Sequence, residues 1–367
     1  METFGKLARR GRAACCVVGL VSLAGVLAPG AARGDSDLQL KLYGDADYAL
    51  SRERSAMPTN GFSIPTTDIF GMAFHERWSF LAEVVLEYDE NTLATDIERI
   101  EVQYGLADWL NVRAGRFHQA IGWYNDAYHH GMYFQLPVHR PAAVNFEDKS
   151  GLLPAHMVGL HFDGRLPVGA AGAIRYDAEV GNNRGRTPHE LAANVDPSKS
   201  KAVNFRLRFE PAVAPDLVVG ANLILDDLPG SSTLTDFSGP PIPGMRERIL
   251  GAHLAYLHHP FHVIVEGYRV QHDEKGVADH VSLAGFAELG YAIGAFEPYF
   301  RFDRAVLAAA DPFLQHAGIG TTNFSESSLG VKWTASDHIA VKLEGDYHRP
   351  DRGDDGIGVA AQLAYGF

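Results

Sequence analysis

The sequence predicts an all-β fold, a transmembrane antiparallel β-barrel of about sixteen strands with a long third loop folded into the bore. Three observations predict it. Apolar and polar residues alternate with period two in segments of about ten residues parted by turn residues. No stretch after residue 34 has the ~18 consecutive apolar residues of a membrane helix. The connections alternate between short and long, as at the two rims of a barrel.

Residues 1–34 have the character of a secretory signal peptide. Basic residues lead, an apolar run over 13–27 follows, and small residues close the segment. The apolar run is too short for a good spanning helix. Both cysteines, Cys15 and Cys16, fall within it, so the mature chain has no disulfide. We therefore expect signal-peptide removal to leave a single outer-membrane barrel domain over 35–367.

The mature chain is acidic. Removal of residues 1–34 takes away five basic residues and one acidic residue, which leaves 27 Lys and Arg against 44 Asp and Glu and a net charge of −17. This excess of acid disfavours nucleic acid as a partner. Length alone would suggest two domains, but barrels routinely exceed that rule, and no linker or repeat follows residue 34.

The expected strands follow the alternation along the chain. In 203–209, for example, four apolar residues alternate with Asn204, Arg206 and Arg208, which puts two arginines opposite the apolar face. The pattern is weaker in 64–75 and 246–258, where Gly and His interrupt it. The sixteen expected strands span 38–50, 64–75, 77–89, 96–106, 109–118, 155–165, 169–182, 200–210, 216–227, 246–258, 260–272, 280–292, 295–304, 323–334, 337–348 and 356–367.

Eight long connections interleave with seven short ones, as sixteen antiparallel strands with both ends on one side require. Amphipathic rings such as Trp78, Trp109 and Trp333 fall at the short-turn ends, where a bilayer interface is expected. The long connections span 51–63, 90–95, 119–154, 183–199, 228–245, 273–279, 305–322 and 349–355.

The third long connection, 119–154, is rich in Tyr, His, Asn, Gly and Pro and too aromatic to be a disordered tail. A long ordered loop in a compact fold is usually functional. We expect this loop to fold into the bore and narrow it. The constriction residues it would supply are Trp123, Tyr124, Asp126, His129, His130, His139, Arg140, Glu147, Asp148 and Lys149.

Charged side chains at the narrowest part decide what passes through a barrel. If the apolar partners face lipid, both signs of charge face the bore and neither predominates. For each of these charges the favoured interpretation is a solvated or mutually paired wall residue. The loop histidines would gain a proton near their usual pKa of about 6.5. The cationic wall residues expected to face the bore are Arg99, Arg113, Arg206, Arg208 and Arg301.

No motif for a metal, a cofactor or catalysis is evident. The pairs His129-His130 and His258-His259 lack the spacing that turns two rings toward one ion. No G-x-S-x-G nucleophile motif is present, so we expect no enzyme.

The alternating last strand ends in Tyr365-Gly366-Phe367, and with the signal peptide and the long third loop it resembles the trimeric porins of Gram-negative outer membranes. Residues 113–117 (Arg-Ala-Gly-Arg-Phe), with 122–125 (Gly-Trp-Tyr-Asn) and 146–148 (Phe-Glu-Asp), are more particularly similar to the phosphate- and polyphosphate-selective porin-like family. The resemblance implies a homotrimer in the outer membrane, in contact with lipid and lipopolysaccharide.

The function expected from the sequence is passive diffusion of small hydrophilic solutes or ions past the constriction. Two alternatives remain open at this stage. One is a structural or adhesive barrel whose bore the loop closes, and the other is an outer-membrane enzyme.

Overall fold

The structure is a computed structural model. The predicted signal peptide, residues 1–34, lies outside the described residues, and residues 36–367 form one compact unit. The residues that the structure describes are 37–52, 60–89, 92–129, 131–145, 152–182, 184–185, 200–230, 242–316 and 322–367.

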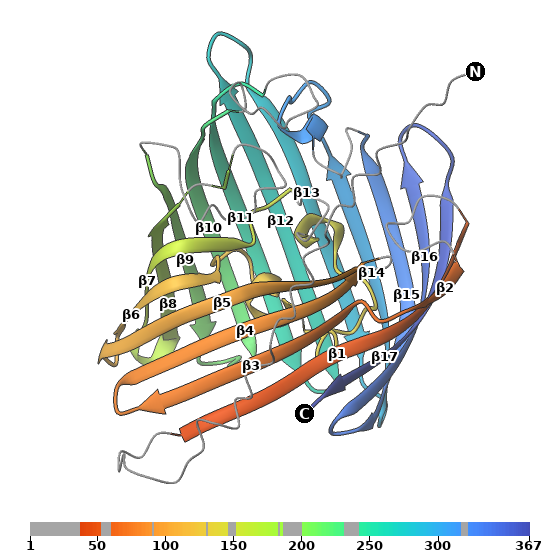
Figure 1. Ribbon diagram of the computed structural model, residues 1–367, viewed down its shortest axis with the longest axis horizontal. Helices are drawn as coiled ribbons and strands as arrows, with labels where there is room; N and C mark the ends of the chain where they lie inside the picture. Colours follow the sequence, from red (N-terminus) through yellow and green to blue (C-terminus); the bar gives the residue numbers. More distant parts are fainter. Residues whose placement is uncertain are drawn as a thin grey trace, which may run out of the picture. The chain divides into compact units, whose positions relative to one another are not determined.

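Seventeen strand segments form a single antiparallel sheet (Figure 1). They are β1 (Asp37–Arg52), β2 (Asn60–Ser63), β3 (Thr66–His75), β4 (Trp78–Asp89), β5 (Thr92–Ala107), β6 (Leu110–His118), β7 (His156–Pro167), β8 (Gly172–Gly181), β9 (Ala202–Pro211), β10 (Leu217–Leu228), β11 (Met245–His258), β12 (Phe261–Glu274), β13 (His280–Tyr291), β14 (Phe296–Val306), β15 (Phe324–Ser336), β16 (Ile339–Pro350) and β17 (Gly356–Gly366).

Short helices interrupt the connections. None of the helices in the described ranges has the length and apolar character needed to cross a membrane. They are α1 (Tyr124–Tyr128) and the 3-10 turns η2 (Ala142–Val144), η3 (Gly169–Ala171) and η4 (Leu314–His316).

Two of the strand segments make one wall strand. β2 and β3 both pair with β1 and are parted only by Ile64 and Pro65. A proline has no N–H for the ladder, so an interruption at this position is expected. The seventeen segments therefore make sixteen wall strands, and the predicted strand count is confirmed.

The sheet closes on itself through its first and last strands. β1 pairs with β17 from Tyr43 opposite Gly366 to Arg52 opposite Ile357. At the end of this seam Phe367 N–H donates to the carbonyl of Leu42 at 2.8 Å, and Leu42 N–H donates to the carbonyl of Phe367 at 2.9 Å. A closed barrel leaves no open sheet edge, and the predicted fold class is confirmed.

The two faces of the wall differ as the alternation predicts. In β9, Phe205 and Leu207 are exposed on the outer face, whereas Asn204 and Arg206 are buried on the inner face. The same division recurs around the wall, where many large apolar side chains are exposed and many charged or amide side chains are buried. This is the inverse of a soluble protein and is typical of a barrel in lipid.

One strand departs from the expected alternation. β5 begins at Thr92 rather than at residue 96, and the pairing with β4 shifts between Glu83 opposite Arg99 and Val84 opposite Ile97. Glu98 is the extra residue of this β-bulge, so its buried side chain does not follow the alternation.

Candidate functional site

The connection between β6 and β7 leaves the wall as the end of a hairpin. β5 pairs with β6 only as far as Ile100 opposite Arg116, whereas β6 and β7 stay paired as far as His118 opposite His156. The hairpin end therefore separates from β5, and the chain that follows lies within the ring of strands in Figure 1. We call its described residues, 119–129, 131–145 and 152–155, the inner loop.

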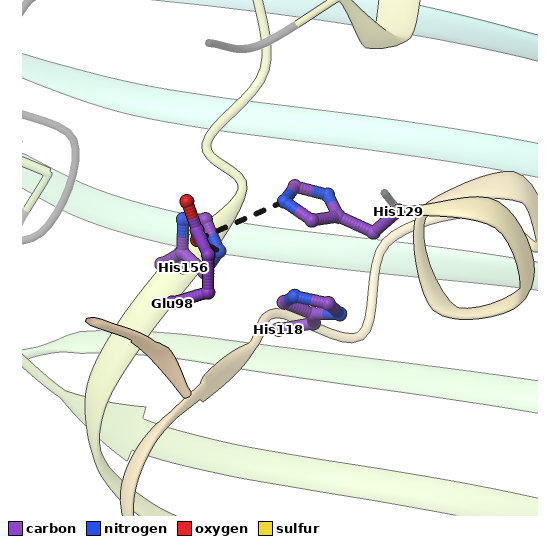
Figure 2. Close-up of side chains that lie close together, drawn as sticks. All are labelled: Glu98, His118, His129 and His156. Carbon is purple, nitrogen blue, oxygen red and sulfur yellow. Dashed lines mark ion pairs between the residues drawn. The ribbon is translucent and has the colours of Figure 1, made fainter. Parts of the chain in front are cut away.

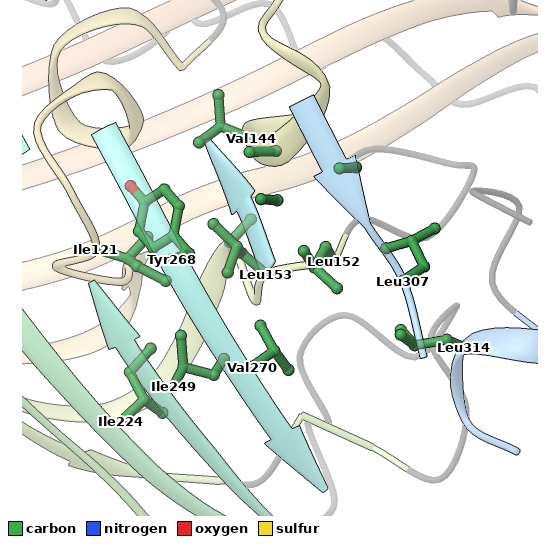
Figure 3. Packing of buried hydrophobic residues seen from close by; sticks show 14 of the residues in the cluster. Ile121, Val144, Leu152, Leu153, Ile224, Ile249, Tyr268, Val270, Leu307 and Leu314 are labelled. Carbon is green, nitrogen blue, oxygen red and sulfur yellow. The ribbon is translucent and has the colours of Figure 1, made fainter. Parts of the chain in front are cut away.

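Apolar side chains of the inner loop pack against the inner faces of β10 to β14. Fully burying one aliphatic side chain contributes roughly 1.5–3 kcal/mol, so this packing is a major attachment of the loop. The residues of this buried cluster labelled in Figure 3 include Ile121, Val144, Leu152 and Leu153 of the loop, with Ile224, Ile249, Tyr268 and Val270 of the wall.

The carboxylate of Glu266, on β12, holds the start of α1. It accepts hydrogen bonds from the backbone N–H groups of Trp123 and Tyr124, both at 2.7 Å, and from the Tyr268 hydroxyl. Gly122 has a φ of 61°, and a Cβ there would lie 2.0 Å from the Tyr268 hydroxyl oxygen. Only glycine allows the loop to approach this carboxylate so closely.

Arg206, on β9, is a second attachment. Its guanidinium is buried and donates to the Gly122 carbonyl at 2.8 Å, to Asp126 at 2.5 Å and to Asp177 at 2.9 Å. A buried cation needs such paired acceptors to offset its desolvation. Arg206 therefore joins the loop to the wall at this point.

The third attachment is Glu344, on β16. Its carboxylate accepts hydrogen bonds from Val138 N–H at 3.1 Å, from His139 N–H at 3.2 Å and from His139 Nδ1 at 2.6 Å. Arg301, on β14, donates to the His139 carbonyl at 2.6 Å.

Burial of the loop residue His139 opposes its charge, but its hydrogen bonds to Asp346 and Glu344 raise its pKa to about 10. The expected pKa near 6.5 is therefore wrong for His139.

Two lysines of the wall also bind the loop backbone. Lys332 Nζ donates to the carbonyl of Tyr133 at 2.6 Å, and Lys342 Nζ donates to that of Pro137 at 3.0 Å. Sequence reasoning did not single out these lysines, Glu266 or Glu344 as loop attachments. The signal in the sequence for these four residues was their place on the inward-facing side of alternating strands.

The structure separates the five predicted wall arginines into two groups. Arg206 and Arg301 have 1% and 0% of their side chains exposed and hold the loop. Arg99, Arg113 and Arg208 keep 21%, 24% and 19% exposed and pair with wall acids, namely Glu83, Glu101 and Asp177.

The remaining predicted loop residues are placed as follows. Trp123 packs against the apolar cluster, and the Tyr124 hydroxyl donates to Gln135 at 2.9 Å. Arg140 is buried. The predicted residues His130, Glu147, Asp148 and Lys149 lie outside the described residues.

Sequence reasoning missed one group of side chains altogether. The bulge residue of β5, the last residue of β6, the first residue of β7 and the residue after α1 converge at the root of the inner loop (Figure 2). One potential ligand atom from each lies within 4.8 Å of the others, and all four residues are buried. We call this group, Glu98, His118, His129 and His156, the histidine–glutamate cluster.

Solved structures share this architecture. The chain is similar to the anion-selective porin from Comamonas acidovorans, with a TM-score of 0.63, 10% identity and coverage of 91% of this chain and 100% of that one. It is also similar to OprB of Pseudomonas putida (TM-score 0.57, 12% identity, 91% and 94% coverage) and to the outer membrane channel DcaP of Acinetobacter baumannii (0.56, 10%, 90% and 97%). No protein-family model and no curated protein matches the chain.

The closed barrel and its apolar outer face define the chain as a sixteen-strand β-barrel with a surface suited to lipid. Its fold is shared with these solved porin structures.

Proposed function

We propose that the chain is a porin, through which small hydrophilic solutes or ions diffuse passively across the outer membrane. The observation that carries the proposal is the attachment of the inner loop to one side of a polar bore, by side chains of β9, β12, β14 and β16. This leaves the partly exposed arginines of β5, β6 and β9, namely Arg99, Arg113 and Arg208, to border the remaining passage. Diffusion through such a passage needs no catalytic residue.

The finer expectations belong to the same proposal. We propose signal-peptide removal before assembly and a homotrimer with lipopolysaccharide as its lipid partner. We do not propose phosphate selectivity, because Lys149 is the single lysine in 119–154.

Conductance in a planar lipid bilayer tests the proposal. The purified protein should produce discrete conductance steps, because each protein that inserts into the bilayer adds the same water-filled passage. A β-rich circular-dichroism spectrum and a gel mobility that changes on boiling would show that the barrel is intact. An intact barrel without conductance would instead support the structural or adhesive alternative.

The charge of His139 leads to a prediction about pH. Its pKa of about 10 means that it stays cationic between pH 5 and pH 8 and loses its charge only as pH rises through about 10. His139→Asn should therefore shift the reversal potential in a salt gradient by the same amount at pH 5 and pH 8. The difference from the parent should shrink above pH 9. A difference that grows on acidification to pH 5 would contradict the assignment.

A further inference from the structure

The histidine–glutamate cluster joins four parts of the chain that are distant in sequence. Glu98 belongs to the wall, His118 and His156 are the facing end residues of the β6–β7 hairpin, and His129 belongs to the inner loop. An ion bound by all four side chains would connect the two ends of the inner loop, the residue after α1 and the barrel wall.

The spacing of the cluster suits a small tetrahedral ion. Zinc bonds to His nitrogen and carboxylate oxygen of about 2.0–2.1 Å place two ligand atoms about 3.4 Å apart. In the cluster, Glu98 Oε2 lies 2.6 Å from His156 Nε2 and 3.9 Å from His129 Nε2. These separations lie on either side of the required value, and all four ligand atoms lie within 4.8 Å of one another, so side-chain shifts of about 1.5 Å or less would be needed for tetrahedral coordination.

The hydrogen bonds of Asn125 fix which nitrogen His129 presents. The Asn125 amide nitrogen donates to the carbonyls of Gln119 at 2.9 Å and Ala155 at 3.3 Å, so its oxygen is the acceptor left for His129 Nδ1 at 3.0 Å. A neutral His129 then carries its proton on Nδ1 and presents the Nε2 lone pair toward the Glu98 carboxylate. In this tautomer Nε2 is the nitrogen that can bind a metal ion together with the Glu98 carboxylate.

The kind of cation follows from the ligands and their surroundings. Three imidazoles and one carboxylate suit zinc and related transition metals, whereas calcium and magnesium prefer oxygen ligands. The nearby charges are mixed: Glu83 Oε2 lies 3.8 Å from His118 Nε2, and Arg116 Nη2 lies 3.8 Å from Glu98 Oε2 and 3.6 Å from Asp96 Oδ2. Arg99 pairs with Glu83.

We propose that the histidine–glutamate cluster binds one divalent transition-metal ion of the zinc class, and that this ion fastens the root of the inner loop to the wall. Asn125 orients His129 for this role. A proton held between His156 Nε2 and Glu98 Oε2, which lie 2.6 Å apart, would be the competing source of positive charge. Binding of the ion does not depend on whether the bore conducts, so metal content tests this proposal separately from the porin function.

The experiment measures zinc bound to the folded barrel. The protein is stripped with a chelator and titrated with Zn²⁺ alone by calorimetry, and bound zinc is counted by elemental analysis. We expect one ion per chain in the parent, and at least 100-fold weaker binding in His129→Asn and in His118→Asn/His156→Asn. His129 lies in the loop, so its replacement leaves the wall strands unchanged. Asn125→Leu should weaken binding by about 10–100-fold, because it frees the His129 ring.

A matched control separates the cluster from other histidines. His139→Asn removes the histidine of the group formed with Glu344 and Asp346, and it should bind zinc as the parent does. Co²⁺ gives a second readout, because four-coordinate nitrogen and oxygen ligation should produce a visible absorption band in the parent that His129→Asn lacks. Equal zinc content in the parent and His129→Asn would overturn the proposal, as would loss of zinc from His139→Asn alone. A parent that binds no zinc would favour the shared proton.

Discussion

Excising residues 124–148 and joining the ends with a short Gly-Ser linker is expected to raise single-channel conductance several-fold. The excised segment includes α1, Asp126 and His139, which fill part of the bore. The wall ladders do not depend on it, because β6 and β7 pair with each other and with their outer neighbours. Removing the segment therefore widens the passage without opening the barrel.

Single-channel recording checks this expectation, with boiling-dependent gel mobility as the measure of folding. The control is a chain in which residues 275–278, which are exposed between β12 and β13, are replaced by the same linker. That variant should conduct as the parent does. A folded 124–148 deletion that conducts no better than the control would show that the inner loop does not limit the current.

Replacing Glu344 with Ala is expected to release the middle of the inner loop. The Glu344 carboxylate accepts four hydrogen bonds, three from Val138 and His139 and one from the Tyr299 hydroxyl at 2.7 Å. Its loss removes the nearer of the two carboxylates that pair with the His139 cation, whose side chain is 23% exposed, at a cost of about 1.5–3 kcal/mol. At 1.4 kcal/mol for each tenfold change, the population with a detached loop should rise by about 10-fold or more.

Thiol labelling measures that population. Both native cysteines lie in the predicted signal peptide, so Val138→Cys gives the mature chain one thiol, at a buried position. A charged maleimide should label it fastest with Glu344→Ala, more slowly with Glu344→Gln and slowest without a second change. Glu210→Ala removes the carboxylate that pairs with Arg165 and Arg175 and serves as the control. Labelling at one rate in all four proteins would refute the attachment.

The strands could be predicted because each carries its own signal. In β9, the inward Asn204 and Arg206 alternate with the outward Phe205 and Leu207, and lipid on one side with water on the other enforces that period in every strand. The prediction failed for β5, where a β-bulge breaks the alternation. Strict alternation puts Glu98 on the face of Ile100, and only the bulge in β5 turns its side chain inward.

The site was less predictable because its contacts join distant residues. The loop histidine His139 was named from the sequence, but its pKa depends on Glu344 and Asp346, and nothing local to residue 139 indicates them. Likewise His129 was compared only with its neighbour His130, whereas the structure brings it against His118 and His156. Metal motifs that rely on spacing cannot detect ligands drawn from four separate segments.

The attachments of the inner loop also constrain the order in which the barrel can fold. Tyr124 and its acceptor Glu266 are 142 residues apart, Val138 and Glu344 are 206 apart, and Met132 and Lys342 are 210 apart. Contacts of such long sequence separation form late, because the loop-closure entropy must be overcome before they contribute. The loop comes from the first half of the chain, yet it cannot dock fully until β16 is in place. We therefore expect the lumen of the assembling barrel to be wider than that of the finished one, and the passage to narrow in the last step of folding.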